Sequence, residues 1–248
     1  MKKLLFGACV ALLPITGFSA TILGFQVGSG IWAHDPSGSI STSADVGVTA
    51  DLKNDFNLSE EEEGYVYAVL EHPVPLIPNF KLVNTKLTSN GTGTLSTAFD
   101  FNGQTYNISS DVTTKLQLDQ KDYIFYWEIL DNVVSVDLGI NAKQIDGNAS
   151  VTSTIDPDTT ITFSGTIPML YAAAEIMLPS GFTIAAEIST ISAGANAITD
   201  TTAKLTYTTD FGLGVEAGLR SQNYTIDMDS VKANMDFSGM FAGVYYKF

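Results

Sequence analysis

The stretch Val134-Ser135-Val136-Asp137-Leu138-Gly139-Ile140-Asn141 alternates strictly between apolar side chains and polar or small ones. Successive side chains of a β-strand point to opposite faces, so this stretch is predicted to be a strand with one apolar face. The same period recurs at 123–129, 170–178, 182–189 and 213–220. The chain is therefore predicted to be all-β.

Strand length and connection size favour a membrane barrel over a soluble sandwich. The alternation persists over about nine to eleven residues, the length that a tilted strand needs to cross a bilayer. Short and long connections alternate along the chain, as they do in outer-membrane barrels with periplasmic turns and external loops. The short ones are 130–132, 179–181 and 209–212, and the long ones are 33–63, 96–115, 144–160, 190–200 and 223–234.

We predict a closed antiparallel transmembrane β-barrel of ten strands. They lie near 22–32, 64–71, 80–89, 116–129, 133–143, 161–178, 182–190, 202–209, 213–222 and 237–248. An even number lets the first and last strands pair, and closure satisfies backbone groups that lipid cannot satisfy. Eight or twelve strands remain open, because the second and third have the weakest patterns. In the second, the lipid-facing set is either Tyr65, Tyr67 and Val69 or Val66, Ala68 and Leu70.

The N-terminus has the pattern of a secretory signal peptide. Lys2 and Lys3 precede an apolar core, and the small residues around Gly17 and Ser19 suit cleavage after Ser19 or Ala20. We therefore predict a signal peptide at 1–20 and a single barrel domain at 21–248. Cys9 lies inside the apolar core, too early for a lipoprotein signal. The mature chain would keep no cysteine, and no later apolar run reaches the roughly 20 residues of a spanning helix.

The overall charge excludes one class of partner. The chain has 12 Lys and Arg against 27 Asp and Glu, a formal net charge of −15. Nucleic-acid binding requires a basic surface, so no nucleic-acid partner is expected. With 45% hydrophobic residues the chain is also too apolar to be disordered.

The C-terminus and one connector carry a resemblance to a known group of proteins. Val244, Tyr246 and Phe248 share one face, and an aromatic last residue resembles the signal that the barrel-assembly machinery reads. The connector from Glu71 to Asn79 (EHPVPLIPN) has three prolines, which make it extended and stiff. Together these features resemble a family of small uncharacterised outer-membrane β-barrel proteins of Gram-negative bacteria. The resemblance implies location and fold, and no activity.

A set of charged residues is predicted to face the lumen if the apolar faces meet lipid. The set is Glu128, Asp137, Lys143, Glu175, Glu187, Lys204, Glu216, Arg220 and Lys247. Five acids and four bases nearly balance, as buried charges require. Ten strands make a small barrel that side chains alone can nearly fill. Inward glycines such as Gly28, Gly30 and Gly214 leave either open room or space for large side chains such as Tyr245.

No catalytic, cofactor or metal site is expected. The two histidines, His34 and His72, fall at opposite ends of the barrel, and His34 is expected to be a rim residue in contact with solvent or headgroups. His34 beside Asp35 has the chemistry of a general base, but no nucleophile motif accompanies it. Glu60 to Glu63 form an acidic run that is usually solvated, although carboxylates also attract divalent cations.

The sequence therefore predicts an outer-membrane barrel of unassigned activity. A structural or surface-interaction protein with a largely plugged polar lumen is the leading expectation. A small passive porin-like pore that leans toward cations is the alternative, and a rim-located enzyme is the least favoured. Expected partners are outer-membrane lipid and lipopolysaccharide, the barrel-assembly machinery during insertion, and divalent cations at the acidic loops.

Overall fold

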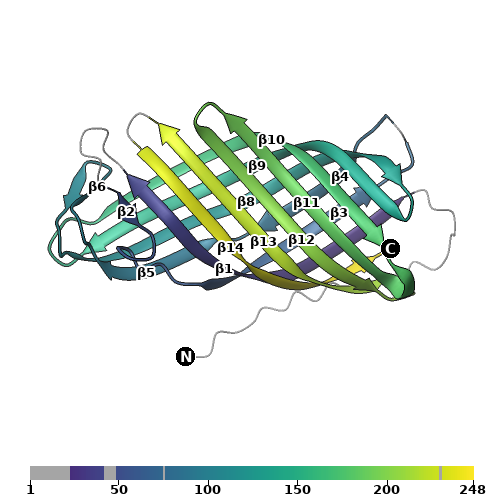
Figure 1. Ribbon diagram of the computed structural model, residues 1–248, viewed down its shortest axis with the longest axis horizontal. Helices are drawn as coiled ribbons and strands as arrows, with labels where there is room; N and C mark the ends of the chain where they lie inside the picture. The colour runs from purple at the N-terminus through teal and green to yellow at the C-terminus, as the bar shows by residue number, and fades with distance from the viewer. Residues whose placement is uncertain (1–22, 42–48, 75, 229–230) are drawn as a thin grey trace.

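The strands of the chain close into one antiparallel barrel. The computed structural model describes residues 23–41, 49–74, 76–228 and 231–248, and the predicted signal peptide lies outside them. Figure 1 shows the barrel from the side. The barrel strands are β1 (Gly24–Ser41), β3 (Glu61–Glu71), β4 (Asn79–Thr85), β5 (Thr88–Thr94), β8 (Asp111–Asp131), β9 (Val134–Ser153), β10 (Thr159–Met177), β11 (Phe182–Ala193), β12 (Asn196–Thr208), β13 (Leu213–Met228) and β14 (Val231–Lys247).

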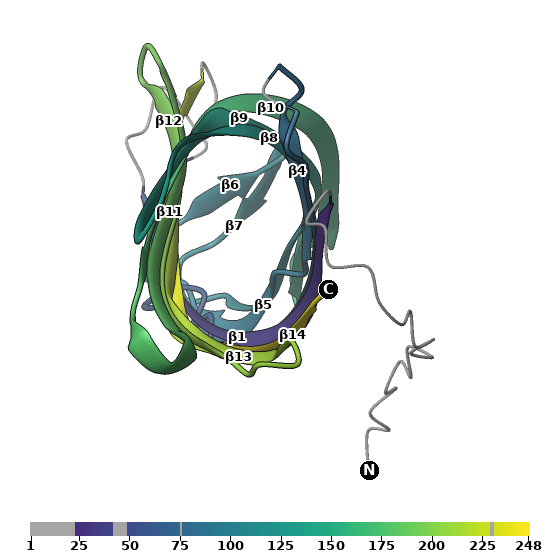
Figure 2. The ribbon, with the colours of Figure 1, turned by 90° about the vertical axis from the view of Figure 1, so that its right-hand side faces the viewer.

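The barrel has ten strands over the described residues, as predicted. β4 and β5 pair one after the other along β8, so together they make one barrel strand interrupted at Lys86 and Leu87. β14 pairs with β1 through Val27↔Tyr246 and its neighbours, which closes the ring (Figure 2). Closure removes the free edges that β1 and β14 would otherwise present to lipid. No helix among the described residues is long and apolar enough to cross a membrane.

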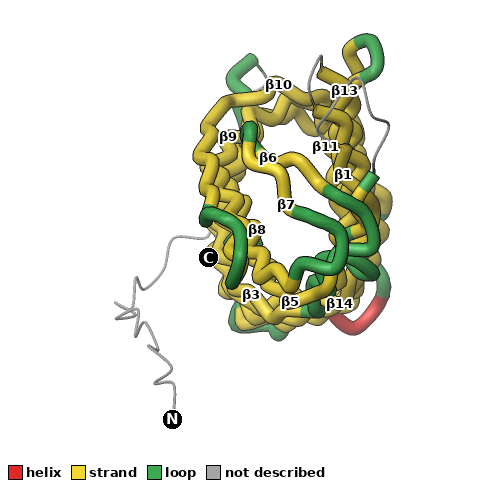
Figure 3. The backbone as a smooth tube through the Cα atoms, turned by 90° about the vertical axis from the view of Figure 1, so that its left-hand side faces the viewer, coloured by secondary structure: helices red, strands yellow, loops and turns green. Residues whose placement is uncertain are grey.

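The two ends of the barrel differ. At one end, here called the turn end, the strands are joined by 72–78, 132–133, 178–181 and 209–212, and the C-terminus lies beside them. The opposite loop end carries the short strands β2 (Ala50–Asp51), β6 (Phe99–Phe101) and β7 (Gln104–Tyr106). The hairpin of β6 and β7 lies across the mouth of the barrel (Figure 3). A three-residue 3-10 turn, η1 (Pro179–Gly181), joins β10 to β11.

An apolar belt surrounds the barrel near the turn end. Its outward side chains include Val66, Leu138, Leu170, Leu219, Met240 and Val244. Leu170 is 70% exposed and Met240 71%, values that water disfavours and lipid hydrocarbon accommodates. Tyr65 and Tyr67 are buried while Val66 is exposed, so the set Val66, Ala68 and Leu70 faces outward.

The strands run much further toward the loop end than the sequence predicted. β9 continues to Ser153, and β11 and β12 are separated by only Gly194 and Ala195. The predicted long loops at 144–160 and 190–200 are therefore mostly strand, and so are the described parts of 223–234. Beyond the belt the outward residues of β9 become polar, as at Gln144 and Asp146, because they no longer face lipid. The lipid-facing apolar set ends there, whereas inward residues such as Ile145 and Val151 are apolar and the backbone pairing continues.

The belt can be tested on one strand with a matched control. Leu138→Arg places a charge on the lipid face and should lower the free energy of unfolding in bilayers by about 2–4 kcal/mol. Gln144→Arg lies six residues further along the same face, above the belt, and should change it by less than about 1 kcal/mol. Urea titration of the refolded protein in lipid vesicles measures both values. Equal effects would contradict the position of the belt.

Candidate functional site in the barrel lumen

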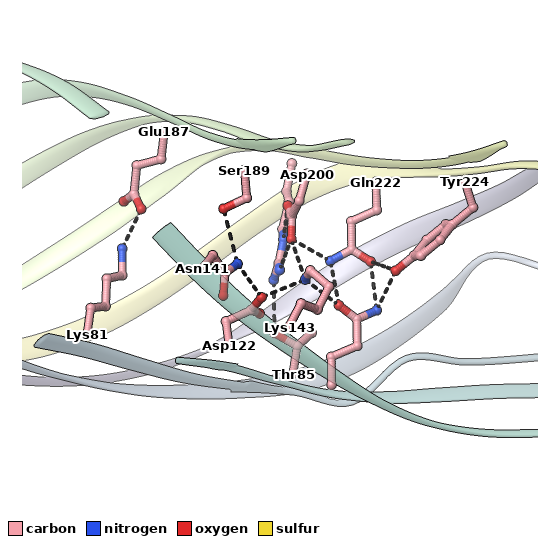
Figure 4. Close-up of polar contacts among 12 residues, drawn as sticks. Lys81, Thr85, Asp122, Asn141, Lys143, Glu187, Ser189, Asp200, Gln222 and Tyr224 are labelled. Atoms are coloured by element: carbon pink, nitrogen blue, oxygen red, sulfur yellow. Dashed lines mark hydrogen bonds and ion pairs between the residues drawn. The ribbon is translucent and has the colours of Figure 1, made fainter. Parts of the chain in front are cut away.

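The middle of the lumen is crossed by a network of ion pairs centred on Asp200. Lys143 is fully buried, and its Nζ lies 2.8 Å from Asp122 Oδ1 and 3.0 Å from Asp200 Oδ2. Arg220 donates to both oxygens of Asp200, from Nε at 3.0 Å and from Nη2 at 2.7 Å, and from Nη1 to Thr85 Oγ1 at 3.0 Å. Figure 4 shows that Lys143, Asp122 and Asp200 converge from separate strands into one interior layer. Each charge in this layer has a partner, as burial requires.

Amide side chains extend the network across the lumen. Gln120 Nε2 donates to Gln222 Oε1 at 2.8 Å and to Tyr224 Oη at 2.9 Å. Gln222 Nε2 in turn donates to Asp200 Oδ2 at 2.9 Å, and Lys143 donates to Gln120 Oε1 at 2.9 Å. Gln120 is on β8 and Gln222 on β13, so these bonds join strands that do not pair with each other.

A second charged group lies closer to the turn end. Glu187 forms ion pairs with Lys81 and, at 3.4 Å, with Lys204. Lys204 also lies 3.2 Å from Glu216, which accepts a hydrogen bond from Tyr65 Oη at 2.8 Å. The side chains of this group come from β3, β4, β11, β12 and β13, so they also span the lumen.

The inward glycines accommodate tyrosine rings. A Cβ on Gly28 would lie 2.3 Å from the Tyr67 ring, and one on Gly214 would lie 2.1 Å from the Tyr245 ring. Both distances are far below van der Waals contact, so any larger residue would displace the ring. Of the two alternatives that the sequence left open, space for tyrosine side chains is the one found at these positions.

The structure places five of the predicted lumen residues inside the lumen and the other four at the turn end. Lys143, Glu187, Lys204, Glu216 and Arg220 belong to the two charged groups described above. Asp137 and Glu175 are half-buried at the turn end, and Glu128 and Lys247 are exposed there.

Sequence reasoning missed other inward residues, mainly Lys81, Asp122, Asp200, Gln120 and Gln222. Asp200 was assigned to a loop that is in fact strand β12. A period-two signal was present, because Asp122 is in phase with Ile124 and Tyr126, and Gln222 with Arg220.

A lid, formed by residues 49–58 and 95–106, covers the lumen at the loop end. Phe56, Leu52, Leu95, Phe99 and Tyr106 are at most 3% exposed and share one apolar cluster. The Phe56 and Phe99 rings meet edge-on with centroids 5.2 Å apart, and Trp32, Tyr224 and Phe237 of the barrel wall belong to the same cluster. The lid therefore closes this end with a small soluble-type core (Figure 3).

Asp55 joins the two segments of the lid. Its carboxylate accepts hydrogen bonds from the Asp51 N–H at 2.8 Å, the Ser96 N–H at 3.0 Å and the Ser96 hydroxyl at 2.5 Å. Burial raises the pKa of this carboxyl, but these hydrogen bonds outweigh burial and hold the pKa below its ordinary value.

His34 is not the solvent-exposed rim residue that the sequence predicted. It is fully buried beneath the lid, with its ring 5.1 Å from Trp32 and 5.9 Å from Phe237 between centroids. The inward phase that His34 shares with Trp32 and the inward folding of the lid bury it. Neither ring nitrogen has a hydrogen-bond partner among the described residues, so no acid or base partner activates it.

The remaining sequence features lie at the surface or at the turn end. Glu61, Glu62 and Glu63 begin β3, whose alternation directs neighbouring carboxylates to opposite faces, and the described part of the chain contains no His, Cys, Asp and Glu group fit to hold a metal. In the proline connector, the His72 N–H donates to Asn79 Oδ1 at 2.9 Å. Val244 and Phe248 of the predicted assembly signal are more than half exposed on the outer face.

Breaking the central network should be costly. Lys143→Met leaves Asp122 and Asp200 short of a buried cation, so the free energy of unfolding should fall by about 3–5 kcal/mol. Lys121→Met, on the exposed face of β8, should change it by less than about 0.5 kcal/mol. The same urea titration measures both variants, and a neutral Lys143→Met would show that the pairs do not stabilise the barrel.

Asp55 gives the lid a defined pH dependence. Because its folded-state pKa is depressed, its contribution is fully present above the ordinary pKa of an aspartate and is lost as the pH falls through the folded-state value. Asp55→Asn should therefore speed hydrogen exchange of peptides within 49–58 at pH 7, and the difference from wild type should shrink as the pH falls through the depressed folded-state pKa of Asp55. Exchange measured at matched pH tests this, with Asp131→Asn at the turn end as control. A constant difference across pH would contradict it.

Comparisons with known proteins show the fold. No protein-family model and no curated protein matches the chain. Among solved structures, the outer membrane protease OmpT from Escherichia coli matches with a TM-score of 0.51 and 9% identity, over 94% of this chain and 99% of that one. The translocator domain of the autotransporter NalP from Neisseria meningitidis gives 0.43 and 10% over 91% and 87%. Ail from Yersinia pestis gives 0.37 and 11% over 92% and 100%. The chain thus has the fold of a transmembrane β-barrel.

Proposed function

We propose that the protein is an outer-membrane β-barrel with a closed lumen that acts as a structural or surface-interaction protein rather than as an open pore. The observation that carries this proposal is the Asp200 network, which joins opposite walls of the barrel through buried ion pairs. The lid adds a second closure at the loop end. A solute that moved along the barrel axis would have to disrupt both the Asp200 network and the lid.

The outer-membrane location rests on three supports. The belt requires lipid, a ten-stranded barrel satisfies its backbone without water, and the C-terminal face of Val244, Tyr246 and Phe248 fits recognition by the barrel-assembly machinery. The turn end then faces the periplasm and the loop end faces outward, as in outer-membrane barrels generally. The polar outward residues above the belt on β9, among them Gln144 and Asp146, would lie beside lipopolysaccharide.

A passive pore is the second candidate. Glu71, Glu128, Asp137 and Glu175 line the turn end, where Tyr126 Oη donates to Glu71 at 3.0 Å. An acidic mouth concentrates cations, so a pore through this barrel would lean toward cations. The ion-pair layer disfavours this candidate because it occupies the path behind the mouth.

A rim enzyme is the least supported candidate. His34 and His72 are the only histidines, and they lie at opposite ends of the barrel, since His34 pairs with Glu61 at the start of β3 and His72 follows the end of β3. His34 is enclosed by aromatic rings, so a substrate at the rim does not reach it. We therefore assign no catalytic residue and no cofactor.

Single-channel recording tests the closed lumen. Protein whose folding is confirmed by its heat-sensitive migration on an unboiled gel is inserted into planar bilayers, and it should give no steady current. The combined variant has Arg220→Ala, which removes one cation of the Asp200 network, and a deletion of residues 97–106, which removes most of one lid segment. This variant should give steady openings. Lys121→Ala, on the outer face, should stay silent. Steady currents from the folded wild-type protein would overturn the proposal in favour of the pore.

A further inference from the structure

Strand β10 has a free edge above the belt. On one side it pairs with β9 from Thr159 to Ile176, whereas on the other side it pairs with β11 only from Leu170 to Met177. No other strand of the described chain pairs with that second side, so the edge is open over residues 159–169. The outward side chains along it carry hydroxyls, unlike the exposed Leu170 below them, so the edge faces the polar exterior rather than lipid.

Pro168 and the shortness of β11 explain why this edge is free. Extending the Leu170↔Thr190 register by two residues places Pro168 opposite Ser192, and a proline has no N–H to donate. β11 then ends at Ala193, and the chain returns as β12 after 194–195. β11 therefore has no residues left to pair with 159–166, and β10 projects beyond the β11–β12 hairpin.

The phase of the ladder identifies the backbone groups on the free edge. At the turn end the Met177 N–H donates to the Val133 carbonyl at 2.8 Å, on the β9 side, and the Leu178 N–H donates to the Phe182 carbonyl at 2.8 Å, on the β11 side. These directions alternate along a strand, and the β9–β10 register has no shift. The residues that direct N–H and C=O groups to the free edge are therefore Thr160, Thr162, Ser164 and Thr166.

The edge lacks the features that normally protect an edge strand. Natural edges carry charged side chains, prolines or bulges that prevent pairing with other chains. Residues 159–167 (TTITFSGTI) contain no charged residue and no proline, and they are mostly Thr and Ile, which favour strands. On the inward side Phe163 is still 46% exposed, because its ring leans over Gly147 of β9 and away from the edge. Backbone groups and an apolar ring are thus both open to an added strand.

The charges around the edge indicate the kind of segment that fits it. Asp146 is opposite Ser164 in the register, and Asp156 and Asp158 lie in the turn that enters β10. No Lys or Arg occurs between residues 144 and 203, and the outward lysines of the neighbouring sheet are on β8, on the far side of β9. An acidic surrounding of this kind attracts a positively charged segment and repels an acidic one.

A second copy of the barrel in the same membrane does not fit the edge. Two barrels in one membrane have parallel axes, and their strands tilt by about 35–45° from those axes. In a pair related by a twofold axis along the membrane normal, the two β10 strands would therefore cross at about 70–90°. Crossed strands cannot form a ladder of hydrogen bonds, whereas an extended segment of a separate protein can align with β10.

We propose that residues 159–167 of β10 are a docking site for an extended, positively charged segment of another protein, which adds to the sheet as a further strand. Strand addition of this kind takes its affinity from main-chain hydrogen bonds and its specificity from alternate side chains. Here the apolar side chains of the added strand would cover Phe163 and Ile161 on the inward side. The proposal rests on the surface-interaction function proposed above and gives that function a site and a class of partner.

Amide hydrogen exchange tests the edge residue by residue. The protein is refolded in lipid nanodiscs, and exchange is followed by NMR without and with the synthetic peptide KTVTVTVTVK. Without peptide, Ile161, Phe163 and Gly165 should exchange slowly because their N–H groups bond to β9, and the N–H groups of the free edge should exchange fast. Peptide at about ten times its Kd should slow exchange at the free-edge positions about tenfold, because exchange then proceeds from the unbound fraction.

Matched peptides and variants separate strand addition from other contacts. The same peptide N-methylated at every Thr and Val nitrogen should give no protection, and ETVTVTVTVE should bind more weakly. Thr162→Pro removes an edge N–H without affecting the β9 ladder and should abolish protection by the peptide. Thr162→Val keeps that N–H and should bind as wild type does. Heat-sensitive migration on an unboiled gel confirms that both variants are folded.

Three results with the wild-type protein would overturn the proposal, whether or not a variant folds. They are slow exchange at the free-edge positions without peptide, unchanged exchange at the highest soluble peptide concentration, and equal protection by the acidic peptide. The outcome is separable from that of the closed lumen. A silent channel without peptide protection would reject only the docking site, and steady currents with peptide protection would reject only the closed lumen.

Discussion

The shared carboxylate of Asp200 is the interaction on which the rest of the lumen depends. It accepts from Lys143, Arg220 and Gln222, which come from β9 and β13, while Asp200 itself is on β12. A closed barrel in lipid turns its apolar side chains outward, so its polar side chains share a narrow interior with little water. Charges in such a space are tolerated only when each is paired and hydrogen-bonded. One carboxylate that serves two cations meets this requirement with few side chains.

Two kinds of packing therefore coexist along one axis. The lid and the wall around Trp32 and Phe237 form an apolar core of the type found in soluble domains, whereas the central and turn-end parts of the lumen are held by ion pairs. The difference has a geometric origin. The strands project beyond the belt at the loop end, where the polar outer residues of β9 are free to contact water. Inward positions there can be apolar, as at Leu116, Ile145 and Val151, and the loops fold inward to cover them.

The sequence was sufficient for the strands but not for their full length. Alternation such as that of Val134 to Ile140 exists because one face meets lipid, and it predicted the number and order of the barrel strands. Above the belt the phase reverses, because the inward residues Ile145 and Val151 are apolar while the outward ones are polar, and the sequence prediction did not follow β9 past this reversal to Ser153. Asp200 was missed because the start of β12 was assigned to a loop.

Lumen contacts between distant strands could not be read from local patterns. Phase along a strand predicted that Lys143, Glu187, Lys204, Glu216 and Arg220 point inward, but it contains no information about which of them meet. Pairing between non-adjacent strands depends on the stagger around the ring, as for Gln120 on β8 with Gln222 on β13. His34 shows the same limit, because its burial follows from a lid contributed by residues far along the chain.

The balance of the lumen charges also constrains what the barrel can hold. A network with an excess of one charge would leave an unpaired ion in the interior and would favour an open, hydrated path for counter-ions. Here the pairing is nearly complete, so the ion pairs close the barrel without leaving an uncompensated charge on its axis. Arg220 takes part in this closure twice, because it pairs with Asp200 and its guanidinium lies 5.0 Å from the centre of the Trp32 ring.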